Sequence, residues 1–226
     1  VVGPSGINIE RFDEKMKLEQ NRRLVTYYSL LTQMRVNGGN DYINLVNSIL
    51  SGKCNQQACL ENYDFKVMSD FNRFNNLQQK LEDEFTLSRM IAGYAWEWKS
   101  KKDKSLYDME LDGVKKQWNY RLENWVLSEG ADKQVGCIHT IQGFDLNYGF
   151  VIMGNEIGYD PESKEIIVRP ENYYDQNGRK TASKEELLEY IKHIYYVLMT
   201  RGIKGTYLYI CDDNLRKYVS SIIGEI

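Results

Sequence analysis

The chain has 226 residues, a formal net charge of −3 at pH 7, and 42% hydrophobic against 27% charged residues. This balance is that of a folded globular protein and excludes the intrinsically disordered class. Because the net charge is slightly negative, no general basic field attracts nucleic acid, so any such binding must use a local surface.

The spacing of cysteines and histidines argues against a metal site, and none is expected. Cys54, Cys59, Cys137 and Cys211 do not form paired Cys-x-x-Cys motifs, and only two histidines are present. Cys137 and Cys211 lie in apolar runs, which indicates buried free thiols in a reducing cytoplasm. No apolar run approaches the roughly 20 residues of a membrane span, so we expect a cytoplasmic protein with no membrane partner.

Residues 1–23 are polar and charged, and we expect them to form a leading segment before a domain that covers residues 24–226. The run RLVTYYSLLTQMR at the start of this domain is compatible with a strand or with a short helix. Beyond it, helical spacing of apolar residues and N-cap signals predict four helices. They are expected from Asn40 or Asp41 to Gly52, over 70–85 with Asp70 as cap, over 183–201 with a capping box of Ser183 and Glu186, and over 212–223 with Asp212 or Asp213 as cap.

Apolar runs between these helices predict strands at 64–69, 87–96, 134–141, 148–158 and 205–211. Strands that alternate with helices favour an α/β domain with a largely parallel sheet. Residues 96–134 contain all four tryptophans and a lysine-rich segment with little periodicity, which indicates an inserted loop or hairpin. Residues 155–182 carry turn signals that are typical of surface excursions.

Three polar islands follow predicted apolar elements: LLTQMR ends at Arg35, IHTIQGFD ends at Asp145, and YYVLMTRG contains Arg201. Ligands of open parallel sheets bind at the carboxyl ends of the strands, so we expect the islands at that edge. Taken singly, each has an ordinary structural explanation. An arginine near a helix end, such as Arg201, is usually a solvated residue that complements the helix dipole, and a lone histidine such as His139 is usually structural.

Taken together and in this order, the islands resemble motifs IV, V and VI of superfamily 1 helicases and ATPases of the UvrD/RecD type. TQMR resembles motif IV, HTIQGFD resembles motif V, and VLMTRG resembles motif VI with its Thr-Arg pair. The wider segments SRMIAGYAWEWKSKKD, VGCIHTIQGFDLNYGFVI and YYVLMTRGIKGTYLYICD are more similar still to the helicase-like domain of Schlafen-type proteins. The resemblance extends over about residues 24–220.

This resemblance implies a RecA-like fold, the second of two such domains that hold ATP and Mg²⁺ between them. It implies that Arg35 and Arg201 reach the γ-phosphate as catalytic residues, since phosphoryl transfer is accelerated by neutralising charge on the transferred group. Gln142 and Gly143 match the turn beside the nucleotide. Asp145 stands where the family usually has a glutamate that accepts a hydrogen bond from the ribose.

The resemblance also implies contact with single-stranded DNA or RNA. His139, with Thr140 beside it, matches the part of motif V that lies near the nucleic acid strand. The aromatic and basic residues Trp96, Trp98, Lys101 and Lys102 are of the types that stack bases and contact phosphates. A covered hairpin with a solvated basic tip is an equally good interpretation of that segment.

The phosphate loop Gly-x-x-x-x-Gly-Lys-Ser/Thr of such ATPases is absent, because GPSG near the start has no Lys-Ser/Thr after it. We therefore expect the C-terminal half of a nucleic-acid-dependent ATPase or helicase. On its own it should hold no cofactor and hydrolyse no ATP, and it requires an N-terminal RecA-like partner domain. The alternatives are a RecA-like interaction or regulatory module that does not translocate, and a nuclease. The EDE sequence at 82–84 is better interpreted as a solvated helix end than as a nuclease metal cluster.

Overall fold

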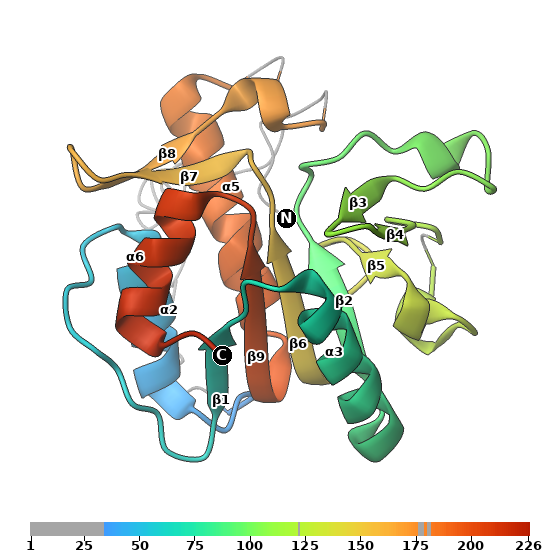
Figure 1. Ribbon diagram of the computed structural model, residues 1–226, viewed down its shortest axis with the longest axis horizontal. Helices are drawn as coiled ribbons and strands as arrows, with labels where there is room; N and C mark the ends of the chain where they lie inside the picture. Colours follow the sequence, from blue (N-terminus) through green and yellow to red (C-terminus); the bar gives the residue numbers. More distant parts are fainter. Residues whose placement is uncertain (1–33, 122, 176–178, 180–181) are drawn as a thin grey trace, which may run out of the picture.

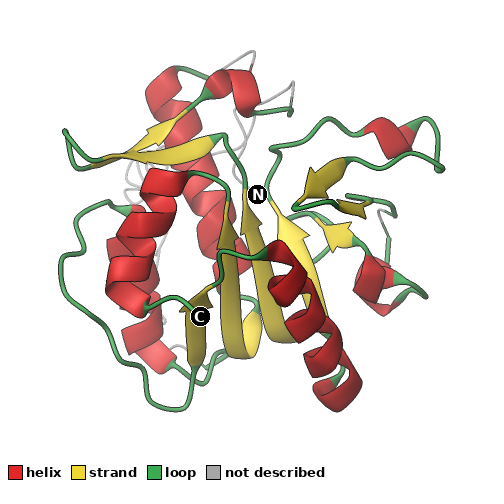
Figure 2. Ribbon diagram, in the orientation of Figure 1, coloured by secondary structure: helices red, strands yellow, loops and turns green. Residues whose placement is uncertain are grey.

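The structure is a computed structural model that describes residues 34–121, 123–175, 179 and 182–226. The expected leading segment and most of the run that begins the predicted domain lie outside the described residues. Within the described part, parallel strands form one central sheet with helices on both of its faces (Figures 1 and 2). The predicted α/β class with a largely parallel, RecA-like sheet is confirmed.

The five strands of the central sheet are all parallel and lie in the order β1-β9-β6-β2-β5. β6 therefore lies in the middle, and every residue of β2 is buried. The strand bounds are Asp64–Val67 for β1, Ser88–Ala92 for β2, Val135–Gly136 for β5, Leu146–Met153 for β6 and Gly202–Ile210 for β9.

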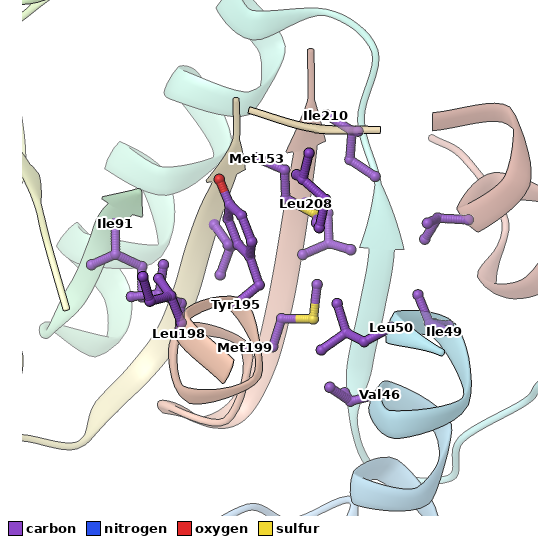
Figure 3. Packing of buried hydrophobic residues seen from close by; sticks show 14 of the residues in the cluster. Val46, Ile49, Leu50, Ile91, Met153, Tyr195, Leu198, Met199, Leu208 and Ile210 are labelled. Carbon is purple, nitrogen blue, oxygen red and sulfur yellow. The ribbon is translucent and has the colours of Figure 1, made fainter. Parts of the chain in front are cut away.

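Helices cover the two faces of the sheet unequally. α3 (Phe71–Phe85) packs on one face through aromatic residues. α2 (Gly39–Leu50), α5 (Lys184–Met199) and α6 (Asp213–Ile223) contribute to the core on the other face. Figure 3 shows that core, in which side chains from α5 and α2 pack together over the strands. The long crossover helices are what allow consecutive strands to run parallel.

The helix caps follow the sequence signals with one exception. Ser183 and Glu186 form the predicted capping box of α5, and Asp212 caps α6 by accepting from the Leu215 N–H at 2.7 Å. For α2 the predicted Asn40 or Asp41 cap is wrong, because the N-cap position is occupied by Gly38 without a side-chain cap bond. The chain turns at Gly38 instead, where a Cβ would lie only 2.7 Å from that of Tyr42.

Three predicted strands are shorter than expected. β2 ends at Ala92, and β5 contains only Val135 and Gly136 of the predicted strand 134–141. The chain leaves β5 in a turn because the Thr140 hydroxyl accepts from the Cys137 N–H at 2.8 Å and donates to the Cys137 carbonyl at 3.0 Å. The predicted strand 148–158 is interrupted after Met153, and a new strand begins at Ile157.

The predicted surface excursion after β6 is an ordered hairpin. β7 (Ile157–Asp160) and β8 (Glu165–Val168) pair antiparallel, and a short 3₁₀ helix, η4 (Pro170–Asn172), follows. Apolar side chains on the inner side of this hairpin are buried in the core that also holds α5 and α6. Turn signals alone could not reveal this covered face.

The predicted insertion at 96–134 contains a hairpin, β3 (Met109–Leu111) with β4 (Val114–Lys116), as expected. It also contains the 3₁₀ helices η1 (Lys99–Lys101), η2 (Trp125–Leu127) and η3 (Ala131–Lys133). The insertion is fixed to the domain, since the Asp112 carboxylate accepts from the Phe71 N–H of α3 at 2.8 Å. Trp118 and Trp125 are fully buried, so they belong to the hydrophobic core and not to an exposed binding surface.

Candidate functional site

The residues expected to act on the nucleotide lie at the amino edge of the sheet. Asp145 immediately precedes β6 and Arg201 immediately precedes β9, and these strands are parallel neighbours. The Leu146 N–H donates to the Arg201 carbonyl at 3.0 Å, which fixes the two strand starts together. Asn37 donates its N–H to the Ile203 carbonyl at 2.8 Å, so the segment with Arg35 lies at the same edge.

This placement corrects the expectation that the polar islands follow strands at the carboxyl edge. The crossover through α5 returns the chain to the edge where β9 begins, so a residue after the helix, such as Arg201, precedes a strand. The loop from β5 to β6 does the same for Asp145. The predicted edge of the sheet was therefore wrong for Arg35, Asp145 and Arg201.

The three charged side chains form one cluster. Nε of Arg35 lies 2.7 Å from Oδ1 of Asp145, and 43% and 49% of these side chains are exposed. Arg201 is half buried, with Nη1 donating to the Phe144 carbonyl at 3.4 Å. Its Nε is buried and has no protein hydrogen-bond partner. The carboxylate of Asp145 thus pairs with Arg35, and its charge also acts on the guanidinium of Arg201.

Burial lowers the pKa of Arg201, and the positive charge of Arg35 lowers it further, while the carboxylate of Asp145 raises it. An arginine stays charged in a protein despite such shifts. The lowered pKa nevertheless indicates that the two guanidinium groups lie close enough to repel each other in partly desolvated surroundings. An oxyanion bound beside them would relieve that repulsion.

A short exposed turn lies beside these charges. Gly143 has a φ of +86°, a conformation that glycine adopts without strain, and a Cβ built there would meet nothing within 4 Å. Gln142 is exposed, and its N–H donates to the His139 carbonyl at 3.4 Å. The predicted pair of Gln142 and Gly143 thus forms an open turn that joins His139 to Asp145.

The predicted nucleic-acid residues of motif V divide between surface and interior. His139 is exposed, and its ring lies edge-on to that of Tyr94 with centroids 6.0 Å apart. Thr140 is only 2% exposed, and its hydroxyl is used by the Cys137 backbone. The structure therefore gives Thr140 the role of holding the turn that presents His139.

The aromatic and basic residues of the insertion are packed more closely than a free stacking surface would be. Trp96 and Trp98 are half buried, and the ring of Trp98 lies edge-on to Trp118 with centroids 6.2 Å apart. The Lys101 ammonium lies 5.0 Å from the centroid of the Trp98 ring, and Lys102 is exposed. The lysines thus face solvent, whereas Trp98 packs within the insertion and Trp96 lies beside Gly154 after β6.

The predicted site residues accordingly form two groups at opposite edges of the sheet. Arg35, Asp145 and Arg201 lie where β6 and β9 begin, while Trp96 follows β2 and His139 follows β5 at the carboxyl edge. The segment from Thr140 to Asp145 connects the two groups along the chain.

Sequence reasoning missed two residues that support these groups. The Tyr63 hydroxyl donates to the Gly202 carbonyl at 3.0 Å and holds the start of β9 directly after Arg201. Tyr94 contacts His139 at the carboxyl edge. Tyr94 lies within the strand predicted over 87–96, and only the end of β2 at Ala92 places it beyond the strand. Tyr63 gives no signal, because its partner is distant in sequence.

Among the described residues, no group of three or more His, Cys, Asp and Glu side chains is placed to hold a metal ion. No helix in the described part of the chain combines the length and apolar character needed to cross a membrane.

The sequence matches known proteins along most of its length. A family model described as Schlafen group 3, DNA/RNA helicase domain, matches residues 6–212. The uncharacterized protein YPL245W of Saccharomyces cerevisiae (strain ATCC 204508 / S288c) is 31% identical over 215 residues, which cover 84% of this chain and 47% of the yeast protein. The chain thus spans about half the length of that relative. No solved structure matches it. The Schlafen-type resemblance is confirmed, and assignment to the UvrD/RecD type stays a prediction.

Proposed function

The chain belongs to the Schlafen group 3 DNA/RNA helicase domain family, and from this premise we propose that it is the second RecA-like domain of a nucleic-acid-dependent ATPase. In this proposal it supplies Arg35 and Arg201 to ATP that a first RecA-like domain binds through a phosphate loop. The observation that carries the proposal is the meeting of these two arginines with Asp145 at one edge of the sheet.

The chemistry of the cluster suits a triphosphate. Guanidinium groups bind phosphate oxygens through paired, charge-assisted hydrogen bonds, and Arg201 carries a buried Nε–H without a protein partner. In the proposed complex the two arginines neutralise charge that develops on the transferred phosphoryl group. Gln142 and Gly143 would lie beside the nucleotide.

The proposed role of Asp145 differs from simple ribose binding. Its carboxylate holds Arg35 at 2.7 Å, and an ATP phosphate that pairs with Arg35 would release one carboxylate oxygen for the ribose hydroxyl. Mg²⁺ would be held by the phosphates and by the first domain, since the cluster consists of two arginines and the carboxylate of Asp145. In this proposal the cluster neutralises phosphate charge and positions the nucleotide, and it does not bind the metal ion.

The proposed nucleic-acid surface is the opposite edge, with His139, Lys101 and Lys102. Separate edges would let single-stranded DNA or RNA and ATP bind at the same time, which a translocating ATPase requires. The turn from His139 to Asp145 is a short covalent connection between the two proposed sites. In this proposal, a ligand-induced movement at one site would be transmitted to the other site through this turn.

The discriminating experiment measures ATP hydrolysis by the full-length protein with and without single-stranded DNA and RNA. We expect single-stranded DNA or RNA to stimulate ATP hydrolysis. The polymer that stimulates it more strongly is then the natural one. The second candidate is a RecA-like module that binds partners without translocating. It is favoured if the full-length protein binds nucleic acid but hydrolyses no ATP above background.

A further inference from the structure

Glu156, between β6 and β7, is the most deeply buried acidic side chain among the described residues, with 1% of it exposed. Its Oε1 accepts a short hydrogen bond from the Tyr195 hydroxyl of α5. Its Oε2 is buried and has no protein hydrogen-bond partner. The buried carboxylate of Asp108 differs, because it accepts backbone N–H groups of Ser100 and Trp118 at 2.8 and 2.7 Å.

The space around Glu156 is closed by two glycines at the carboxyl edge. A Cβ at Gly154 would lie 2.6 Å from Oε2, and a Cβ at Gly93 would lie 2.8 Å from Oε1. The Tyr195 hydroxyl also accepts from the Gly154 N–H at 3.0 Å. Figure 3 shows Tyr195 projecting from α5 onto the sheet, with its hydroxyl directed toward the carboxyl end of β6. One small polar cluster therefore joins the ends of β2 and β6 to α5.

Among the described residues, none of the titratable groups that face Glu156 brings a positive charge. They are Tyr195 from α5, Tyr173 after η4, and Cys211 at the end of β9. The guanidinium of Arg169 is engaged by Asp212 at 2.7 Å and donates to the Asn155 carbonyl at 3.2 Å. An ionised Glu156 would therefore be a buried charge without a counter-ion in the part of the chain that the structure describes.

We propose that Glu156 is a proton-binding site of the folded domain, and that loss of its proton weakens the packing of α5 against the carboxyl edge of the sheet. A neutral acid needs no counter-ion, and burial disfavours its ionised form. Burial raises the pKa of Glu156 from 4.5 to about 7, which the hydrogen bond from Tyr195 opposes. Glu156 in turn raises the pKa values of Tyr195 and Cys211, after burial itself.

The direction of the pH effect follows from linkage. The unfolded chain releases this proton near pH 4.5, whereas the folded domain holds it until about pH 7. The folded state therefore binds more protons between these values, and its stability falls as the pH rises through this window. Above the window the loss is complete and the contribution of Glu156 no longer changes. This inference does not depend on the proposed nucleotide site.

The test is thermal unfolding of the full chain from about pH 5 to about pH 8, with Glu156→Gln beside the wild type. Glutamine keeps the shape without the charge, so the wild type should lose several degrees of Tm relative to this variant as the pH rises. Glu165→Gln, at an exposed position of β8, is the matched control and should follow the wild type. Parallel pH profiles for Glu156→Gln and the wild type would overturn the proposal.

Two further measurements keep the proposal testable if Glu156→Gln folds poorly. Tyr195→Phe removes the hydrogen bond that favours the ionised form, so the pH window should move upward. An unmoved or lowered window would contradict the assignment. Infrared spectra near pH 6 should contain the band of a protonated buried carboxylic acid in the wild type. Its absence would also overturn the proposal, whatever the stability of the variants.

Discussion

Nε of Arg35 lies 2.7 Å from Oδ1 of Asp145, and both charges act on the guanidinium of Arg201. The ion pair is well exposed, so it contributes little to the stability of the fold. Its effect is on position, because it keeps Arg35 at the start of β6 while Arg201 stands at the start of β9. The carboxylate also reduces the repulsion between the two arginines.

Replacing Asp145 by Asn should therefore impair ATP turnover more than stability. The variant loses the charge that orients Arg35, and we expect about a tenfold fall in kcat/KM, in line with the loss of one charge-assisted hydrogen bond. Unfolding free energy should change by less than about 1 kcal/mol. Steady-state kinetics of the full-length protein and denaturant unfolding check the two parts. Glu110→Gln, which alters an exposed pair with Lys115, is the control. Unchanged kinetics in Asp145→Asn would refute its positioning role.

The isolated chain should bind ATP weakly or not at all. The cluster offers two arginines and one open turn, whereas most contacts to the triphosphate are assigned to a phosphate loop that this sequence lacks. Isothermal titration calorimetry of the chain with ATP should show no binding of micromolar affinity. Micromolar binding, or steady hydrolysis by the chain alone, would mean that the site is complete without a partner domain.

Single-strand binding should depend on the exposed lysines of the insertion. We expect the double variant Lys101→Glu and Lys102→Glu to bind fluorescent oligonucleotides more weakly at low salt. Its salt dependence should also be shallower, by about 0.7 in the log–log slope for each phosphate that the variant no longer neutralises. Lys217→Glu, at an exposed position of α6, is the matched control. If the wild type, the double variant and the control bound the oligonucleotide equally well, the nucleic-acid binding surface would lie elsewhere.

The tryptophans of the insertion should respond differently. Trp98 packs against Trp118, so Trp98→Ala should lower the stability of the hairpin as well as any stacking with bases. His139→Ala removes an exposed ring and should weaken strand binding without a comparable loss of Tm. Thermal unfolding measured beside each titration separates these effects. A fall in binding with unchanged Tm in Trp98→Ala would favour direct stacking by that ring.

Arg89 of β2 should hold both α3 and the insertion to the sheet. Nη1 of Arg89 lies 2.6 Å from Oε2 of Glu82, and its Nε donates to the Val126 carbonyl at 3.1 Å. Arg89→Ala leaves both acceptors without this partner, and we expect a loss of about 3–5 kcal/mol in unfolding free energy. Lys115→Ala, in the exposed pair with Glu110, should cost less than about 1 kcal/mol. Equal effects of the two variants would show that Arg89 does not hold α3 and the insertion to the sheet.

Local signals in the sequence predicted the elements of the fold well. The capping box at Ser183 and the cap at Asp70 fixed two helix starts, because both depend on residues three positions apart. The interpretation of residues 82–84 as a solvated helix end was wrong for Glu82, which pairs with Arg89. That partner lies on the following strand, and periodicity within a helix carries no information about it.

The motif resemblance identified the arginine cluster but not its place on the sheet. The edge at which Arg201 lies depends on the crossover from β6 through α5 to β9, a property of topology rather than of any short pattern. The burial of Thr140 and of Glu156 was hidden for the same reason. Both depend on how segments that are distant in sequence pack together.

The most direct test of the central claim is the ATP turnover of the full-length protein carrying Arg201→Ala, measured with saturating single-stranded nucleic acid. We expect turnover to fall by about 10³-fold or more, with a far smaller change in nucleotide affinity, because the arginine acts on transition-state charge. Arg35→Ala should behave similarly, and Arg216→Ala, which alters a surface pair with Asp213 on α6, should not. Near wild-type turnover in both Arg201→Ala and Arg35→Ala would contradict the account.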